Sequence, residues 1–122
     1  MKWLTVQVGG QKWRIDLVKG NHRSLKEGES PLHGCTLYDE CKIYIAREQS
    51  EQAREDTLLH ELLHAAMYVS RGHHAIREFC PDEPSAARAE EKIVEGLVLI
   101  LHPVLKDMGF KCPKGPNAGA TS

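Results

Sequence analysis

Apolar and polar residues alternate along two stretches near the start of the chain, KWLTVQV and KWRIDLV, which are separated by Gly9 and Gly10. A period of two is typical of half-buried strands, and a pair of glycines supplies the positive φ angles of a tight hairpin turn. The pattern therefore predicts a β-hairpin over residues 2–18. After a polar loop at residues 19–34, the shorter stretches TLY and KIYIA predict a second hairpin.

A longer, helical pattern follows the strands. Ser50 can cap a helix whose body, EQAREDTLLHELLHAAMYVSR, contains no Gly or Pro until Gly72 provides a C-terminal stop. Beyond a loop rich in His, Cys and Pro, Ser85 opens a second helix, AARAEEKIVEGLVLIL, which His102 and Pro103 are expected to end or kink. The short amphipathic stretch VLKDMGF completes the pattern.

This order of elements predicts an α+β fold, in which a short antiparallel or mixed sheet of two hairpins packs on two helices. At 122 residues the chain has the size of one domain, and we assign that domain to residues 1–110. Residues 111–122 have the Gly, Pro and small polar residues of a loose C-terminal tail.

Composition narrows the function classes. The chain has 16 basic and 17 acidic residues, and the resulting formal net charge of -1 gives no sign of nucleic-acid or membrane-surface binding. The N-terminus lacks the apolar core of a signal peptide, and no stretch approaches the roughly 18 apolar residues of a membrane span. We therefore expect a cytoplasmic protein without a membrane partner. The four cysteines form no CxxC pair, which argues against a zinc ribbon.

The centre of the first predicted helix carries the motif HExxH, formed by His60, Glu61 and His64. Four residues advance an α-helix by about 400°, so both histidines stand on one face and can reach one ion. Zinc takes neutral imidazole ligands, and a catalytic site has three protein ligands and a position for water. Glu61 lies beside that position and is suited to accept a proton from the water. The spacing predicts a zinc site.

A third ligand is needed, and the sequence offers more than one kind. A metzincin-type site is excluded, because Met67 and Ser70 stand where that motif needs Gly and His. A histidine at His73 or His74 could complete the site, as in SprT-like proteases. A glutamate in the stretch AEEKIVEGL of the second helix is the other choice.

The succession of IYIA, LLHELLHA and EEKIVEGL, within about residues 35–105, resembles the small zincin-like metallopeptidases of gluzincin type (HExxH…E). These include minimal forms common in phages and prophages and the ImmA/IrrE-type domains. The resemblance implies a zincin-like fold, with His60 and His64 as zinc ligands, Glu61 as the general base and Glu91, on the next helix, as the third ligand.

Helical geometry and this resemblance differ by one residue. On a helical wheel, Glu90 rather than Glu91 points into the apolar arc of the second helix. The resemblance favours Glu91, with Glu95 one turn further on as an acid that would orient a ligand histidine. We therefore expect Glu91 as the ligand, followed by Glu90 and then by His73 or His74.

The expected activity is hydrolysis of a peptide bond in a peptide or protein substrate by zinc-activated water. An additional donor for the oxyanion is expected among Tyr68, Arg71, His73 and His74. We also expect the strand KIYIA at the sheet edge beside the metal helix, where an extended peptide could add as one more strand. The alternative function is a non-catalytic, zinc-bound protein-interaction module of phage or regulatory origin. The sequence leaves the oligomeric state open.

Overall fold

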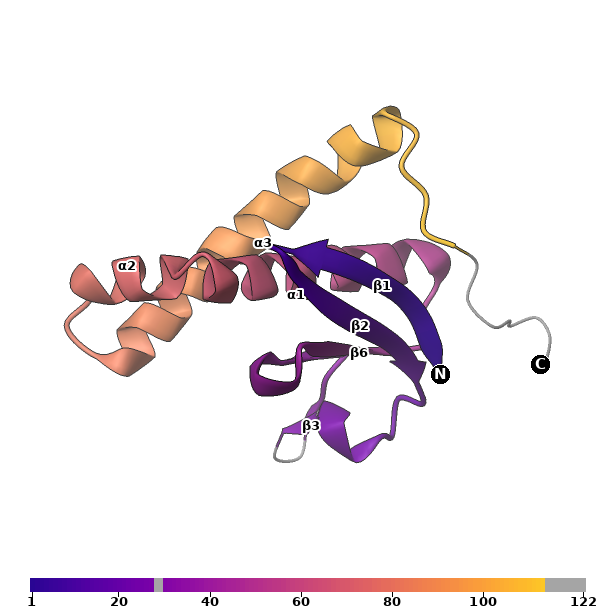
Figure 1. The fold of residues 1–122 in the computed structure, drawn as a ribbon, viewed down its shortest axis with the longest axis horizontal. Coiled ribbons are helices and arrows are strands. Elements are labelled where there is room, and N and C mark those ends of the chain that lie inside the picture. The colour runs from indigo at the N-terminus through magenta and orange to yellow at the C-terminus, as the bar shows by residue number, and fades with distance from the viewer. Residues whose placement is uncertain (28–29, 114–122) are drawn as a thin grey trace.

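The computed structural model describes residues 1–27 and 30–113 and contains a mixed four-stranded sheet with one long helix packed against it (Figure 1). The predicted α+β class is confirmed. The elements, in chain order, are β1 (Lys2–Val8), β2 (Gln11–Val18), η1 (Arg23–Leu25), β3 (Lys26–Glu27), β4 (Ser30–Pro31), β5 (Gly34–Leu37), η2 (Tyr38–Glu40), β6 (Lys42–Ala46), α1 (Glu51–Val69), α2 (Gly72–Glu78) and α3 (Glu83–Asp107).

The predicted first hairpin is confirmed. β1 and β2 pair in antiparallel fashion. Between them Gly9 and Gly10 have φ angles of 59° and 87°. Positive φ at both central residues is what a two-residue hairpin turn requires, and glycine adopts it without a steric penalty.

The second hairpin is also confirmed, since β5 and β6 pair in antiparallel fashion. The strand order is β1-β2-β6-β5, with β6 parallel to β2. The expectation that KIYIA lies at the sheet edge is therefore wrong, because this strand is β6 and has a neighbour on both sides. The inner place suits its sequence, since Ile43 and Ile45 are fully buried there. The edge strand beside α1 is β5 instead.

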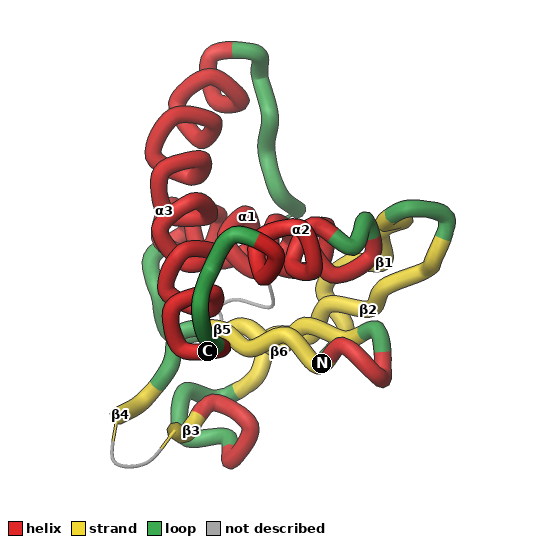
Figure 2. Tube along the Cα trace, turned by 90° about the vertical axis from the view of Figure 1, so that its left-hand side faces the viewer, coloured by secondary structure: helices red, strands yellow, loops and turns green. Residues whose placement is uncertain are grey.

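One face of the sheet forms the core with α1 (Figure 2). Alternate residues of β2 and β6 point to this face, as the period of two predicts. The buried core residues are Trp13, Ile15, Leu17, Ile43, Ile45, Leu58, Ala65 and Cys112. α3 makes its main contacts with α1 and α2 rather than with the strands. α1 is therefore the layer that joins the sheet to α3.

The start of α1 agrees with the prediction from the sequence, but its end does not. Ser50 caps the helix by accepting a hydrogen bond from the backbone N–H of Ala53, at 3.1 Å. The helix ends at Val69, and Arg71 takes the left-handed turn with φ 64°. The prediction of Gly72 as the stop is wrong, because Gly72 begins α2 inside the stretch that was expected to be a loop.

α3 is longer than predicted at both ends. Asp82 rather than Ser85 caps it, and accepts a hydrogen bond from the Ser85 N–H at 2.8 Å. The helix also continues through Pro103 to Asp107, so of the two expected effects of this proline, an end or a kink, the end is wrong. The proline ring leaves the carbonyl of Leu99 without its helical donor. Leu99 is an exposed residue, so that carbonyl can be hydrated.

The beginning of the predicted tail packs against the protein. Cys112 belongs to the core, and the indole N–H of Trp3 donates to the backbone carbonyl of Pro113 at 2.8 Å. Residues 114–122 of that tail, and residues 28–29 of the predicted loop, lie outside the described residues. Within the described ranges, no helix has the length and apolar character needed to cross a bilayer.

Candidate metal centre

His60 and His64 lie one turn apart on α1, and their ring centroids are 4.9 Å apart. α3 crosses this face of α1 and brings Glu91 to both rings. Glu91 Oε1 lies 2.7 Å from His60 Nε2, and Glu91 Oε2 lies 3.2 Å from His64 Nε2. The three predicted ligands thus converge, with one ligand atom from each within 4.8 Å of the others, and this group could bind a metal ion.

Glu90 contacts the other side of the His64 ring. Its Oε2 lies 2.6 Å from His64 Nδ1. A carboxylate at Nδ1 favours the tautomer that has its proton there, which leaves the Nε2 lone pair available to a metal. The contact with the second ring nitrogen that was expected of Glu95 is therefore made by Glu90. Both neighbouring glutamates belong to the site, at different nitrogens of one imidazole.

Glu61 is held beside these groups by the edge strand. The Thr36 hydroxyl donates a hydrogen bond to Glu61 Oε1 at 2.6 Å. Gly34 packs against the stem of the same side chain, since a Cβ at this position would lie 3.0 Å from Glu61 Cγ. Sequence reasoning missed both residues of β5. Their period-two spacing on a strand before the HExxH helix is the signal that could have identified them.

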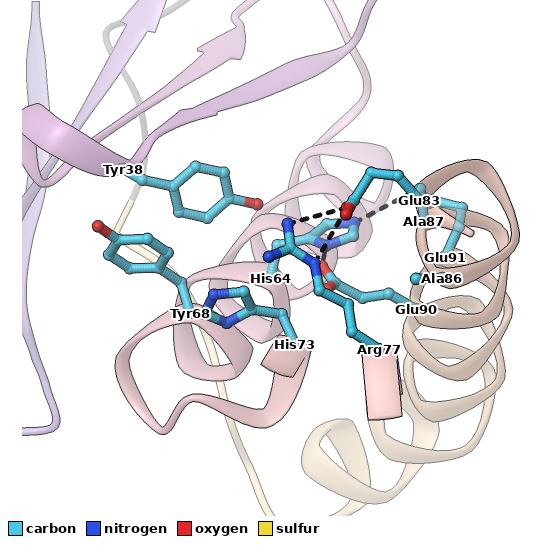
Figure 3. Close-up of a pocket in the computed structure, with 10 residues that line it drawn as sticks. All are labelled: Tyr38, His64, Tyr68, His73, Arg77, Glu83, Ala86, Ala87, Glu90 and Glu91. Atoms are coloured by element: carbon cyan, nitrogen blue, oxygen red, sulfur yellow. Dashed lines mark hydrogen bonds and ion pairs between the residues drawn. The ribbon is translucent and has the colours of Figure 1, made fainter. Parts of the chain in front are cut away.

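A pocket opens on each side of the three ligands. One, of about 470 Å³, has mainly apolar walls around His60 and Glu61, including Leu32, Gly34, Val98 and Leu99. The other, of about 460 Å³, adjoins His64 and Glu91 (Figure 3). The ligands therefore lie between two spaces that could each receive part of a substrate.

Aromatic rings line the second pocket. Tyr38 and Tyr68 have ring centroids 4.7 Å apart, and Tyr68 stacks on His73 at 5.5 Å. The Tyr38 hydroxyl points toward the His64 ring (Figure 3). Burial raises the pKa of Tyr38 above its usual range, and the charges of Glu90 and Glu61 raise it further. The hydroxyl therefore keeps its proton and can donate a hydrogen bond. Tyr38 is a further residue that the sequence reasoning missed.

The alternative histidine ligands are not part of the converging group. His73 Nδ1 lies 3.2 Å from the backbone carbonyl of Met67, and its ring contacts that of His74. His74 is exposed. Arg71 forms the turn between α1 and α2, outside the residues that line either pocket. Of the two kinds of third ligand that the sequence offered, the structure thus places a glutamate beside His60 and His64, and not a histidine.

A second histidine cluster joins α1 to α3 about one helical turn closer to the start of α1 than His60. His102 Nε2 lies 3.1 Å from Glu55 Oε1, and His102 Nδ1 lies 2.5 Å from Asp56 Oδ1. Lys106 Nζ approaches the same Glu55 oxygen at 3.0 Å. Burial raises the pKa of Glu55, but hydrogen bonds from His102 and Lys106 outweigh it and lower the pKa below its ordinary value.

The two sets of residues differ in how far their histidines are exposed, with the His60 side chain 26% and the His102 side chain 7% exposed. The open cluster consists of His60, His64, Glu90 and Glu91; the closed cluster consists of Glu55, Asp56, His102 and Lys106. The closed cluster contains its own cation. In the described part of the chain, no lysine or arginine forms an ion pair with Glu90 or Glu91. Two imidazoles and a carboxylate without a basic partner form a donor set that suits a divalent metal such as zinc.

Comparisons with protein-family models, with curated proteins and with solved structures find no match for this chain. The geometry of its own residues therefore carries the functional argument.

Proposed function

We propose that this chain is a zinc-dependent peptidase with a small zincin-like fold of gluzincin type. The observation that carries the proposal is the convergence of His60, His64 and Glu91, with Glu61 held beside them in the wall of one of the two pockets. The placement of an HExxH helix under a mixed sheet, next to an antiparallel edge strand, supports the proposed fold.

His60 Nε2, His64 Nε2 and a Glu91 carboxylate oxygen are the atoms that would hold the zinc ion. When bound, zinc supplies Lewis acidity, which acidifies a water and polarises a substrate carbonyl. Glu90 keeps the His64 ring in the orientation and tautomer that ligation needs. α3 thus contributes both a ligand and the group that orients another ligand.

Glu61 is the proton carrier of the proposed reaction. Its Oε1 already accepts the hydrogen bond of Thr36, so Oε2 is the oxygen that accepts a proton from the attacking water. The same oxygen then gives this proton to the amine that leaves. The cycle returns Glu61 to its carboxylate form without any other acid.

Tyr38 is the donor that we assign to the developing oxyanion. Tyr68 and His73 were expected candidates, but Tyr68 packs on the far side of Tyr38 from His64 (Figure 3), and His73 stacks on Tyr68 in turn. The Tyr38 hydroxyl points to the ligand histidine (Figure 3), and burial together with the acids of the site raises its pKa, so that it stays protonated. A neutral donor fixed in place before reaction stabilises the negative charge as it forms.

An extended peptide is the substrate that fits the edge of the sheet. The Ala46 N–H donates to the His33 carbonyl, so alternate residues of β5 direct their backbone groups to β6. Gly34 and Thr36 then present their N–H and C=O groups to the open edge, where a peptide strand can pair with them. Such a peptide would lie beside Glu61 and could place side chains in both pockets.

Elemental analysis of the purified protein tests the metal. We expect close to one zinc per chain, which His60→Ala and Glu91→Ala each abolish. The double variant His73→Ala, His74→Ala is the matched control and should retain zinc, because neither residue joins the converging group. Loss of zinc in the control alone would contradict the gluzincin-type site and favour the SprT-like ligand set.

A peptide library analysed by mass spectrometry tests the activity. The zinc-loaded wild type should cleave members of the library, whereas Glu61→Gln should bind zinc and cleave at a rate lower by at least about 100-fold, because an amide cannot accept the proton. Zinc binding without cleavage by either protein would favour the non-catalytic zinc-bound module, and equal cleavage by both would exclude Glu61 as the general base.

A further inference from the structure

Strand β5 approaches α1 unusually closely at Gly34. A Cβ at this position would lie 2.6 Å from Thr57 Cγ2 and 3.0 Å from Glu61 Cγ. A side chain at this position would have to displace the Thr57 methyl group and the stem of Glu61. Glycine therefore allows the edge strand to lie directly against the segment of α1 that carries Glu61.

Two residues further along β5, Thr36 faces the same side. Its hydroxyl lies 2.6 Å from Glu61 Oε1, a short distance typical of a hydroxyl that donates to a carboxylate. The backbone of Thr36 points to the open edge of the sheet, as the register with β6 requires. One residue thus contacts the general base with its side chain and presents its backbone to an incoming strand.

We propose that Thr36 is a positioning residue, which holds Glu61 in its proton-accepting orientation and links that orientation to the pairing of a peptide with β5. The inference rests on the proposed function, because Glu61 has this role only beside a bound metal. Thr36 fixes Oε1 and leaves Oε2 for the proton. A peptide paired with β5 fixes the backbone of Thr36, and so restrains the hydroxyl that holds the base.

Acetohydroxamate is a suitable probe, since it chelates zinc and transfers a proton to a neighbouring base as it binds. The test measures its affinity for zinc-loaded protein by calorimetry, together with zinc content and melting temperature. Thr36→Val keeps the shape of the side chain and removes the hydroxyl. We expect it to retain zinc and to bind acetohydroxamate about tenfold more weakly, as loss of a hydrogen bond to a charged group implies.

Three further variants isolate the hydroxyl. Thr36→Ser restores it and should bind within about twofold of the wild type. Thr5→Val makes the same change at an exposed position of β1, at the other edge of the sheet, and should also leave the affinity unchanged. Thr36→Ala removes the hydroxyl with a smaller side chain, and replaces Thr36→Val if that variant does not fold.

A double-mutant cycle decides whether Thr36 acts through Glu61. Thr36→Val should have no further effect on acetohydroxamate affinity in the Glu61→Gln protein, because the base that it positions is absent. Equal tenfold losses in both backgrounds, or wild-type affinity in Thr36→Val, would overturn the inference and leave the proposed zinc site intact. A wild type that binds no zinc would overturn both.

Discussion

Two clusters of histidine and acid join α1 to α3, and they differ in exposure and in charge. The closed cluster has a buried pair at its centre, with Glu55 1% and the His102 side chain 7% exposed, and the half-exposed Asp56 and Lys106 flank that pair, Lys106 supplying a cation. In the open cluster the side chains of His60 and Glu91 are 26% and 44% exposed. Here no basic side chain of the described residues pairs with the acids.

The difference in exposure and charge shows how similar residues can stabilise the fold in one cluster and form a possible metal site in the other. A buried carboxylate is stable only when it is paired, and Glu55 has both a histidine and a lysine. The open cluster lies between two pockets and directs its two Nε2 atoms at one carboxylate. We infer that the closed cluster fixes the crossing of α1 and α3, and that this crossing places Glu91 within reach of the two histidines.

The largest expected effect is a loss of stability when the closed cluster is changed. His102→Ala removes one of the two partners of the buried Glu55 carboxylate, and since Lys106 remains as the other, it should lower the free energy of unfolding by about 3 kcal/mol. Denaturant unfolding of the metal-free protein measures this loss. The same substitution at His22, a part-buried histidine outside both clusters, is the control and should cost far less. Equal costs at the two positions would contradict the structural role of the closed cluster.

The open cluster should stabilise the protein mainly when the metal is bound. Zinc at 100 times its Kd should raise the free energy of unfolding of the wild type by about 2.7 kcal/mol. His64→Ala should abolish this increase, because it removes a ligand. Unfolding curves with zinc and with a chelator measure the difference. A zinc-dependent increase that survives in His64→Ala would exclude His64 as a ligand.

Substitutions of Glu90 and Glu95 in α3 test which glutamate orients the proposed ligand His64. Glu90→Ala should weaken zinc binding by about 10- to 100-fold while the ligands remain, as the loss of a group that orients a ligand does. Glu95→Ala, one turn away at an exposed position, should leave the affinity unchanged. Competition with a coloured chelator measures both affinities. The opposite ranking would restore the role that the sequence suggested for Glu95.

The smallest effect concerns the helix between the two clusters. Gly96 is exposed within α3, and a Cβ at this position meets no atom within 4 Å. Gly96→Ala should therefore raise the free energy of unfolding by about 0.8 kcal/mol through helix propensity. Zinc affinity should not change. A change in affinity would show that the two clusters are coupled through a deformation of α3.

The features that could be predicted from the sequence are those set by local periodicity. The turn at Gly9 and Gly10 follows from local backbone preferences, and the shared face of His60 and His64 follows from helical geometry. The wheel also identified Glu90 as the more buried glutamate, which the structure bears out at 17% exposure against 44% for Glu91. It could not show that both glutamates contact His64, because that depends on how α3 crosses α1.

Features that depend on contacts distant in sequence could not be predicted. The parallel pairing of β2 with β6 placed KIYIA inside the sheet, and no local pattern records which strand will be the edge. Tyr38 joins the site only because β5 lies beside α1. Pro103 was expected to interrupt α3, but its cost is reduced where the freed carbonyl can reach water. Contacts of His102 and Lys106 with α1 also stabilise this part of α3.

X-ray absorption at the zinc edge tests the central claim most directly, since it reports the ligands around the metal in the intact protein. For the wild type, the account predicts two imidazoles and carboxylate or water oxygen at about 2.0 to 2.2 Å, without a sulfur shell at about 2.3 Å. Glu91→Ala should bind too little zinc, at the same protein and zinc concentrations, to give this spectrum. A sulfur shell, or a wild-type spectrum that Glu91→Ala leaves unchanged, would contradict the claim that His60, His64 and Glu91 hold zinc.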